Sequence, residues 1–240
     1  MMRVVCAVSA NHLYALGNSN HCSLCFMSSL DCFNSLTHLF HNSSTPKESM
    51  QVEHHPLKPF LPSSTRLLML GSFPPARHRW SMDFFYPNFI NDMWRIFGIC
   101  FHDDKIYFVD EENKTFRKSL IIELLEAKGI GLYDTATEVI RLKNTASDKD
   151  LEVVQPTDIH ALLQQIPLCT SIVTTGQKAT ELLCSFFGVG VPKIGSFAET
   201  TYEGKVMHLY RMPSSSRAYP MKVEKKAEFY KQMFMAEGLI

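Results

Sequence analysis

Four short apolar runs separated by helix-like segments constrain the fold of this chain more than any other feature. The runs have the length and composition of buried strands, and they span residues 67–72, 130–134, 171–176 and 206–212. The segments around them carry amphipathic spacing, capping residues or a closing glycine, and they span residues 89–97, 119–128, 157–165, 177–187 and 222–237. Because strands that alternate with helices pair in parallel and are covered by those helices, we expect an α/β fold, a three-layer α/β/α sandwich with a central four-stranded, mainly parallel sheet.

The order of these elements also predicts where a ligand binds. In open α/β folds, ligands bind beyond the carboxyl ends of the strands. Four loops occupy that edge of the predicted sheet, and they begin at Gly71, Asp134, Thr175 and Met212. The first and last of these loops are unusual in composition and are therefore the main candidates for a functional site.

The balance of charge limits the partners that the whole chain attracts. Lysine plus arginine number 24 and aspartate plus glutamate number 24, so the formal net charge is zero. A chain with no net positive charge is not a highly basic protein of the kind that coats nucleic acid. A nucleic-acid site in it therefore depends on a local cluster of cations. No apolar run approaches the roughly 18–20 residues of a membrane-spanning helix, so we expect no membrane association.

The first 49 residues differ from the rest of the chain. They hold only four charged side chains, and no helical or strand periodicity persists in them. Met50 opens a segment suited to be the native start of the protein. We therefore expect residues 1–49 to be a disordered or mis-called N-terminal extension and residues 50–240 to form the domain.

The seven cysteines favour a reduced, intracellular protein, cytoplasmic if the source is bacterial. Their number is odd, and Cys100 and Cys184 have apolar neighbours, which is typical of buried thiols rather than of a disulfide framework. Cys22-x-x-Cys25 has the spacing of half a zinc or redox site, but no second pair follows at the spacing of a zinc finger. No glycine motif for phosphates or dinucleotides is present, so we expect neither a metal nor a cofactor.

The loop after the first strand interleaves cations with aromatic rings. Two prolines stiffen residues 73–75, the run 77–80 reads Arg-His-Arg-Trp, and three aromatic residues follow at 84–86. Cations pair with phosphates and aromatic rings stack on bases, so this composition is typical of a surface that binds a nucleic-acid strand. The alternative is an apolar loop that packs on the sheet and leaves its arginines in solvent.

The loop after the fourth strand is rich in short hydroxyl side chains. Pro213 and three serines are followed by Arg217, and small side chains let backbone N–H groups approach a phosphate closely. The alternative is a flexible serine turn. A serine hydrolase built on Ser214–Ser216 is a third interpretation, but the chain has no Gly-x-Ser-x-Gly elbow and no histidine partner is indicated.

Together these loops resemble the uracil-DNA glycosylase superfamily, most closely its hypoxanthine (deoxyinosine) DNA glycosylase branch, over about residues 66–236. The first motif of that superfamily, Gly-x-x-Pro after a strand, is matched at 71–74, and the aromatic residue that stacks on the extruded base falls on Phe85. An Asn-x-x-Trp pair is matched by Asn91 and Trp94, and the final proline–serine loop by 213–216. The second strand of that branch resembles residues 129–134.

Two positions depart from the superfamily pattern. Many members carry aspartate or asparagine at the place of Phe73, where it positions or activates water, and several branches carry histidine at the place of Met212. The hypoxanthine branch also lacks that acid, and the resemblance implies reliance on the asparagine before the tryptophan, here Asn91. About one inserted residue precedes Asn91 relative to that pattern, so Asn88 and Asp92 remain alternative equivalents.

The motifs and the resemblance together assign three groups of site residues. The catalytic candidates are Asn91, Asp134 and Ser72. The base-binding candidates are Phe73, Phe85, Tyr86, Asn88 and Trp94. The DNA-binding candidates are Arg77, Arg79, Lys178, Pro213, Ser214, Ser215, Ser216 and Arg217.

The resemblance implies a monofunctional DNA glycosylase that acts as a monomer in base excision repair. Such an enzyme flips a deaminated base, uracil or another such as hypoxanthine, out of the DNA stack and hydrolyses its N-glycosidic bond. The alternative is a catalytically silent nucleic-acid-binding protein of the same fold, which the departures at Phe73 and Met212 favour.

Overall fold

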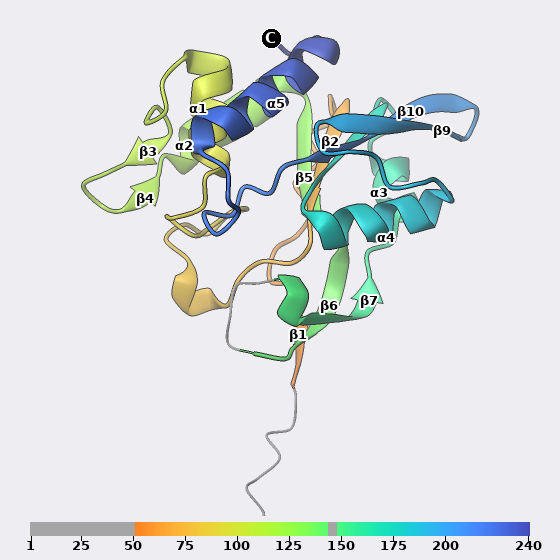
Figure 1. Ribbon diagram of the computed structural model, residues 1–240, viewed down its shortest axis with the longest axis horizontal. Coiled ribbons are helices and arrows are strands. Elements are labelled where there is room, and N and C mark those ends of the chain that lie inside the picture. The colour runs from red at the N-terminus through yellow and green to blue at the C-terminus, as the bar shows by residue number, and fades with distance from the viewer. Residues whose placement is uncertain (1–50, 144–147) are drawn as a thin grey trace, which may run out of the picture. The chain divides into compact units, whose positions relative to one another are not determined.

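A five-stranded sheet lies at the centre of the computed structural model, which describes residues 51–143 and 148–240 (Figure 1). In spatial order β5-β2-β8-β10-β9, its strands are β5 (Ile130–Asp134), β2 (Leu67–Gly71), β8 (Ser171–Thr175), β10 (Lys205–Met212) and β9 (Ser196–Tyr202). The extension predicted at 1–49, with its Cys22-x-x-Cys25 pair, lies outside the described residues.

The four predicted strands are the four parallel ones. β2 pairs in parallel with both β5 and β8, and β8 pairs in parallel with β10. The expected number of four strands is wrong, because β9 adds an antiparallel edge strand to β10. A turn with left-handed backbone at Glu203 (φ 49°) and Gly204 (φ 78°) joins these two strands. β9 mixes serine, threonine and glutamate with few apolar residues, so a search for apolar runs does not find it.

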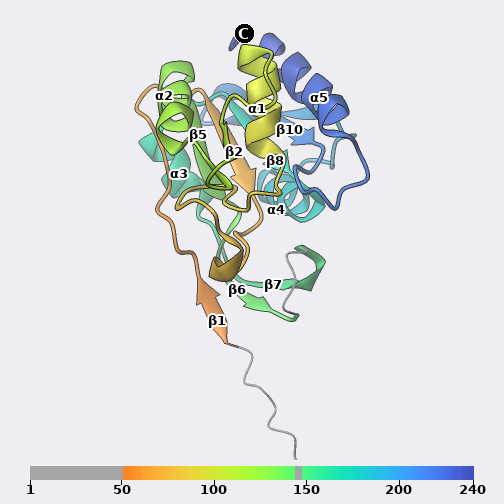
Figure 2. The same ribbon diagram turned by 90° about the vertical axis from the view of Figure 1, so that its left-hand side faces the viewer.

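Five α-helices accompany the sheet in the described part of the chain. They are α1 (Met93–His102), α2 (Lys118–Lys128), α3 (Ile159–Gln165), α4 (Gln177–Phe187) and α5 (Val223–Ala236). α1 packs against α5, as the rotated view shows, whereas α4 packs on β8 and α2 on β5 (Figure 2). The helix predicted at 89–97 is wrong in its bounds, since α1 begins at Met93 and passes through Gly98. A side chain at Gly98 would place its Cβ 2.3 Å from the Asp104 carbonyl oxygen, so this glycine permits a close approach rather than ending the helix.

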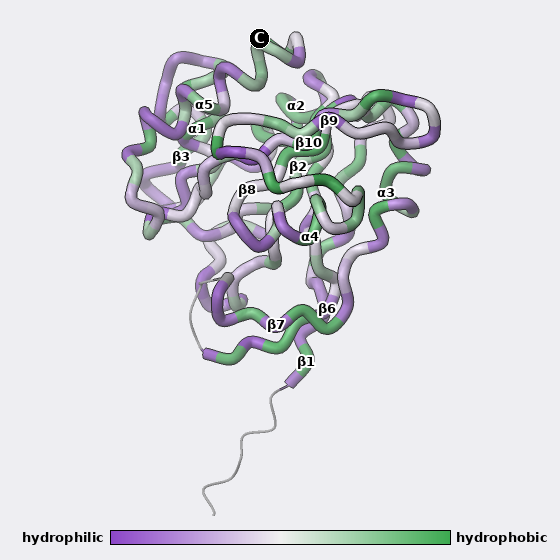
Figure 3. Tube along the Cα trace, turned by 45° about the vertical axis from the view of Figure 1, so that its right-hand side comes forward, coloured by the Kyte–Doolittle hydropathy of each residue, from purple (hydrophilic) through white to green (hydrophobic). Residues whose placement is uncertain are grey.

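A second, smaller sheet lies beyond the end of β5. Its antiparallel strands, in the order β1-β6-β7, are β1 (Val52–His54), β6 (Ala136–Arg141) and β7 (Leu151–Pro156). Hydrophobic stretches of β6 and β7 are visible in Figure 3, and Val139 and Leu151 form a minor core with Phe73. The remaining short elements are β3 (Val109–Asp110), β4 (Thr115–Phe116), and the 3-10 turns η1 (Arg77–Arg79) and η2 (Asp148–Asp150).

Burial of aromatic and aliphatic side chains holds the domain together. Every residue of β2 is buried, and so are Trp94 of α1 and Phe234 of α5. Cys100, Cys169 and Cys184 are free and buried, as predicted for Cys100 and Cys184. Burial raises the pKa of the Cys100 and Cys169 thiols to about 12. Within the described ranges, none of the helices has the length and apolar character to cross a membrane.

Candidate functional site

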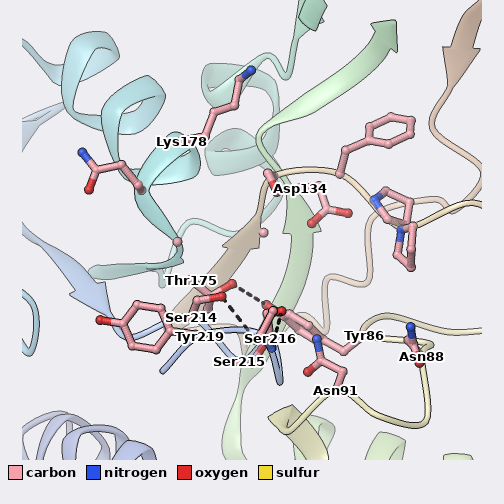
Figure 4. Close-up of a pocket in the computed structure, with 18 of the residues that line it drawn as sticks. Tyr86, Asn88, Asn91, Asp134, Thr175, Lys178, Ser214, Ser215, Ser216 and Tyr219 are labelled. Carbon is pink, nitrogen blue, oxygen red and sulfur yellow. Dashed lines mark hydrogen bonds between the residues drawn. The ribbon is translucent and has the colours of Figure 1, made fainter. Parts of the chain in front are cut away.

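The carboxyl ends of the four parallel strands meet at one edge of the central sheet. Strand pairing sets Gly71 of β2 beside Asp134 of β5, and Thr175 of β8 beside Met212 of β10. All four residues line one cavity of about 980 Å³, which Figure 4 shows in close-up. The four loops selected from the sequence therefore converge, and their cavity lies at the upper end of the volumes typical of ligand pockets.

Asp134 supplies a carboxylate to this cavity. Its side chain is 11% exposed, and its Oδ2 atom lies 2.8 Å from His55 Nε2. Its Oδ1 atom lies against Gly71, where an added Cβ would come within 2.3 Å of it. The missing side chain at Gly71 therefore makes room for the carboxylate.

His55 is a site residue that the sequence reasoning missed. It lies just after β1, and its side chain is 2% exposed. Its ring contacts those of Tyr133 (4.7 Å between centroids) and Phe73 (5.3 Å). A single histidine in an extended, polar segment carries no motif, and 79 residues separate it from Asp134. Only the pairing of β1 with β6, which directly follows β5, brings the two together.

Asn91 and Asn88, two of the three candidates for the catalytic asparagine position, line the cavity. Asn91 Oδ1 accepts a hydrogen bond from the Met93 amide at 2.9 Å, so the free face of its side-chain amide is the Nδ2 donor. Asn88 Oδ1 similarly accepts from the Ile90 amide at 3.1 Å. Figure 4 shows both asparagines at the margin of the pocket.

Asp92, the third alternative, lies away from the cavity. Its carboxylate is buried, with Lys226 Nζ at 2.9 Å from Oδ2 and Arg217 Nε at 3.3 Å from Oδ1. A carboxylate held by two cations is committed to an ion pair. Asp92 therefore has a structural role in the described domain, and Asn91 and Asn88 remain the candidates for contact with a ligand.

Three of the predicted base-binding aromatic residues line the cavity. Phe73 and Phe85 are mostly buried, with 8% and 4% of their surfaces exposed. The Tyr86 hydroxyl lies 3.4 Å from Thr175 Oγ1, and burial raises the pKa of this phenol. Tyr86 also has a left-handed backbone (φ 50°), a conformation that costs energy in a non-glycine residue and is often retained at functional sites.

Trp94 does not line the cavity. It is 1% exposed, its Nε1–H donates to the Phe85 carbonyl oxygen at 3.1 Å, and its ring lies edge-on to that of Tyr86. The structure thus places Trp94 behind the aromatic wall, where it supports Phe85 and Tyr86 and is out of reach of a base.

Cationic side chains outnumber acidic ones around the cavity. Six cations line it against two acids, Asp134 and Glu181; the cations are Arg79, Arg141, Lys149, Lys178, Arg211 and Arg217. Three of the six were not singled out from the sequence, because the β6–β7 region and β10 bring them in from outside the two main loops. Arg141 is paired with Glu53 at 2.9 Å and Arg217 with Asp92 at 3.3 Å, so acids outside the cavity lining neutralise part of this charge. The lining is still cationic in a chain with no net charge overall, and such a local cluster favours binding of phosphates.

Besides Arg217, which pairs with Asp92, two more of the predicted cationic contacts have other partners. Arg77 lies outside the cavity, pairs with Asp83 at 2.7 Å and stacks on the Trp80 ring at 4.0 Å. Lys178 lines the cavity, and its Nζ donates to the Leu151 carbonyl oxygen.

The proline–serine loop is anchored by hydrogen bonds on three sides. The Asp92 amide donates to the Ser215 carbonyl oxygen at 2.9 Å, and Lys226 Nζ donates to that of Ser216 at 2.7 Å. The Tyr230 hydroxyl donates to the Pro213 carbonyl oxygen at 2.9 Å. These contacts hold the loop against the cavity, which its residues Pro213, Ser214, Ser215, Ser216 and Arg217 line.

Ser72 lines the cavity at the end of β2, beside Phe73. Among the described residues, no group of three or more histidine, cysteine, aspartate or glutamate side chains is arranged to hold a metal ion.

Comparison with solved structures identifies a similar fold. The chain resembles the solution structure of a provisionally assigned uracil DNA glycosylase from Methanosarcina acetivorans, with a TM-score of 0.50 and 20% sequence identity. The match covers 76% of this chain and 99% of that protein. At this identity the similarity establishes the fold. No protein-family model matches the sequence, and no curated protein matches it.

Proposed function

We propose that this protein is a monofunctional DNA glycosylase that excises a deaminated base by hydrolysis of its N-glycosidic bond. One observation carries the proposal: a cavity at the carboxyl edge of the sheet combines a carboxylate, an amide donor and aromatic walls with a cationic rim. The fold shared with the Methanosarcina acetivorans protein supports the same class of enzyme. We further infer that the helices and the central sheet form a three-layer α/β/α sandwich. We also infer that the protein acts as a monomer.

The cationic rim and the serine loop account for binding of DNA. Phosphates on either side of the target nucleotide pair with side chains such as Arg79 and Arg217, and the backbone of the serine loop approaches the strand closely. A flipped base then enters the cavity, whose volume of about 980 Å³ exceeds that of one nucleotide base. Phe85 or Tyr86 contacts the face of the base, which contributes about 1–3 kcal/mol per stacked base.

Asn91 accounts for the preference for deaminated bases. Its Oδ1 atom is held by the Met93 amide, so it offers Nδ2–H to a ligand. Deamination converts the amino group of cytosine or adenine, which is a donor, into a carbonyl oxygen, which is an acceptor. An N–H donor at this place therefore favours uracil over cytosine and hypoxanthine over adenine. The sequence motifs of this chain resemble most closely those of the hypoxanthine (deoxyinosine) DNA glycosylase branch.

Asp134 and Asn91 act on opposite charges in the transition state. As the bond breaks, the sugar becomes cationic and the base becomes anionic. The Asp134 carboxylate stabilises the sugar and orients the attacking water, and the Asn91 amide and the backbone N–H groups near Ser72 stabilise the oxygen of the leaving base. Loss of one such donor costs about 10²–10³ in rate in other enzymes.

A base-release assay across four substrates tests this function. Duplexes that contain uracil, hypoxanthine, xanthine or a thymine mismatch are incubated with excess protein, and alkaline treatment then cleaves any abasic site. We expect cleavage of the uracil or the hypoxanthine duplex, and at least a hundredfold slower cleavage with Asn91→Ala at unchanged DNA affinity. Gln164→Ala, which removes an exposed amide from α3, is the matched control and should retain full activity.

The catalytically silent alternative rests on Phe73 and Met212. Both side chains are buried, at 8% and 1% exposure, and neither can activate water. Saturable binding of the four duplexes without any abasic product would establish that alternative and refute the glycosylase.

A further inference from the structure

We infer that His55 is a positioning residue, which holds the Asp134 carboxylate in the orientation that base excision requires; the inference rests on the proposed function. His55 lies outside the stretch that carries the motifs and is not exposed to the cavity. It therefore acts on the reaction through Asp134 and not on the DNA.

The geometry fixes one carboxylate oxygen and leaves the other available. His55 Nε2 lies 2.8 Å from Asp134 Oδ2, in a pair whose side chains are 2% and 11% exposed. Asp134 Oδ1 lies over Gly71 and has no hydrogen-bond donor among the described residues. Asp134 lines the cavity, and we assign the contact with a water or a sugar to the oxygen that His55 does not hold.

The imidazole is itself held at both ends. Its Nδ1 atom lies 2.8 Å from the Leu57 carbonyl oxygen and 3.2 Å from the Leu57 amide nitrogen. The carbonyl accepts from a protonated Nδ1 and the amide donates to a bare one, so Leu57 serves either state of the ring. In the neutral tautomer with a bare Nδ1, and in the imidazolium, Nε2 carries a proton and can donate to the carboxylate.

Within residues 51–143 and 148–240, His55 Nε2 has no hydrogen-bond partner other than Asp134. The titratable groups that face it are Asp134 and Tyr133, both on β5, while the loop after β2 presents only the rings of Phe73 and Phe85. The ring is locked by these aromatic contacts, and a group locked by packing and hydrogen bonds is what precise positioning requires.

The test separates positioning from DNA binding. Single-turnover base release and DNA affinity are measured on the substrate that the native protein processes fastest. We expect His55→Leu to slow base release at least tenfold with less than a twofold change in affinity. His55→Gln, whose amide can still donate to the carboxylate, should recover most of the rate. His54→Leu, at the exposed neighbouring histidine, is the matched control and should be unchanged.

A double variant tests whether His55 acts through Asp134. If it does, His55→Leu slows a protein that already carries Asp134→Asn by less than twofold. Equal losses in both backgrounds, or full activity of His55→Leu, would overturn the inference. If the native protein releases no base from any substrate, the proposed function fails instead.

A spectroscopic measurement keeps the inference testable if His55→Leu does not fold. A slowly exchanging imidazole N–H proton, shifted downfield by its bond to a carboxylate, should appear in the NMR spectrum of the native protein and disappear in Asp134→Asn. Its absence from the native spectrum would contradict the pairing.

Discussion

Gly71→Ala should slow base release because it displaces the carboxylate of Asp134. Gly71 pairs with Asp134 across β2 and β5, and a Cβ at Gly71 would lie 2.3 Å from Asp134 Oδ1. Ordinary contact begins near 3.4 Å, so the oxygen must move by about 1.1 Å. The backbone of Gly71 is not left-handed, and alanine therefore fits it without strain of its own.

The expected magnitude follows from that displacement. A misplacement of about 1 Å in a reacting group costs about 10²-fold in rate, so base release should fall about a hundredfold at nearly unchanged DNA affinity. The shift also weakens the bond between His55 and Asp134, which should lower the free energy of unfolding by about 1–3 kcal/mol.

Single-turnover base release, fluorescence anisotropy on the same duplex and urea denaturation measure the three quantities. Gly190→Ala is the matched control, because an added Cβ there meets no atom within 4 Å. A Gly71→Ala variant with the native rate of base release would refute the placement of Asp134 in the reaction.

Two further predictions concern stability. Lys226→Met should lower the free energy of unfolding by about 3–5 kcal/mol in urea denaturation, because it leaves the buried Asp92 without its fully buried partner. Lys225→Met, the control, breaks an exposed pair with Glu228 and should lower it by less than about 1 kcal/mol. Equal effects of the two variants would contradict the anchoring role of Lys226. Burial raises the pKa of the Glu237 carboxyl, but hydrogen bonds from Ser171, Tyr210 and His208 outweigh it and hold this pKa below its ordinary 4.5. The ionised carboxylate therefore stabilises the folded state above pH 4.5, and this contribution is lost as the pH falls through the lowered pKa of the folded protein. Glu237→Gln should therefore reduce stability at pH 7 and flatten the acid limb of the denaturation midpoint, and an unchanged acid limb would contradict this assignment.

The strands and the site edge could be predicted from the sequence because both follow from local patterns. The run at 67–71 has no polar side chain, and every residue of β2 is buried. The parallel order of the strands then directs the loops at Gly71 and Met212 to one edge of the sheet. β9 could not be found in this way, since an edge strand exposed on one face has no continuous apolar run.

The details of the site depend on contacts between distant residues. Asp92 and Asn91 are neighbours with similar side chains. Asp92 is distinguished as the ion-paired residue by contacts with Arg217 and with Lys226, which lies 134 residues beyond it. His55 likewise lies in no sequence motif, because its place in the site depends on contact with the distant residue Asp134. Trp94 was placed with the base-binding residues on motif spacing, which does not reveal that its indole points into the core.

Quantification of the free base tests the central claim most directly. The native protein is incubated with a duplex that contains one uracil or one hypoxanthine, and the filtrate is analysed by mass spectrometry while abasic sites are counted in the retained DNA. We expect free base and abasic sites in equal amounts, and far less of both products with Asp134→Asn over the same time. Full occupancy of the duplex with no base in the filtrate would contradict it.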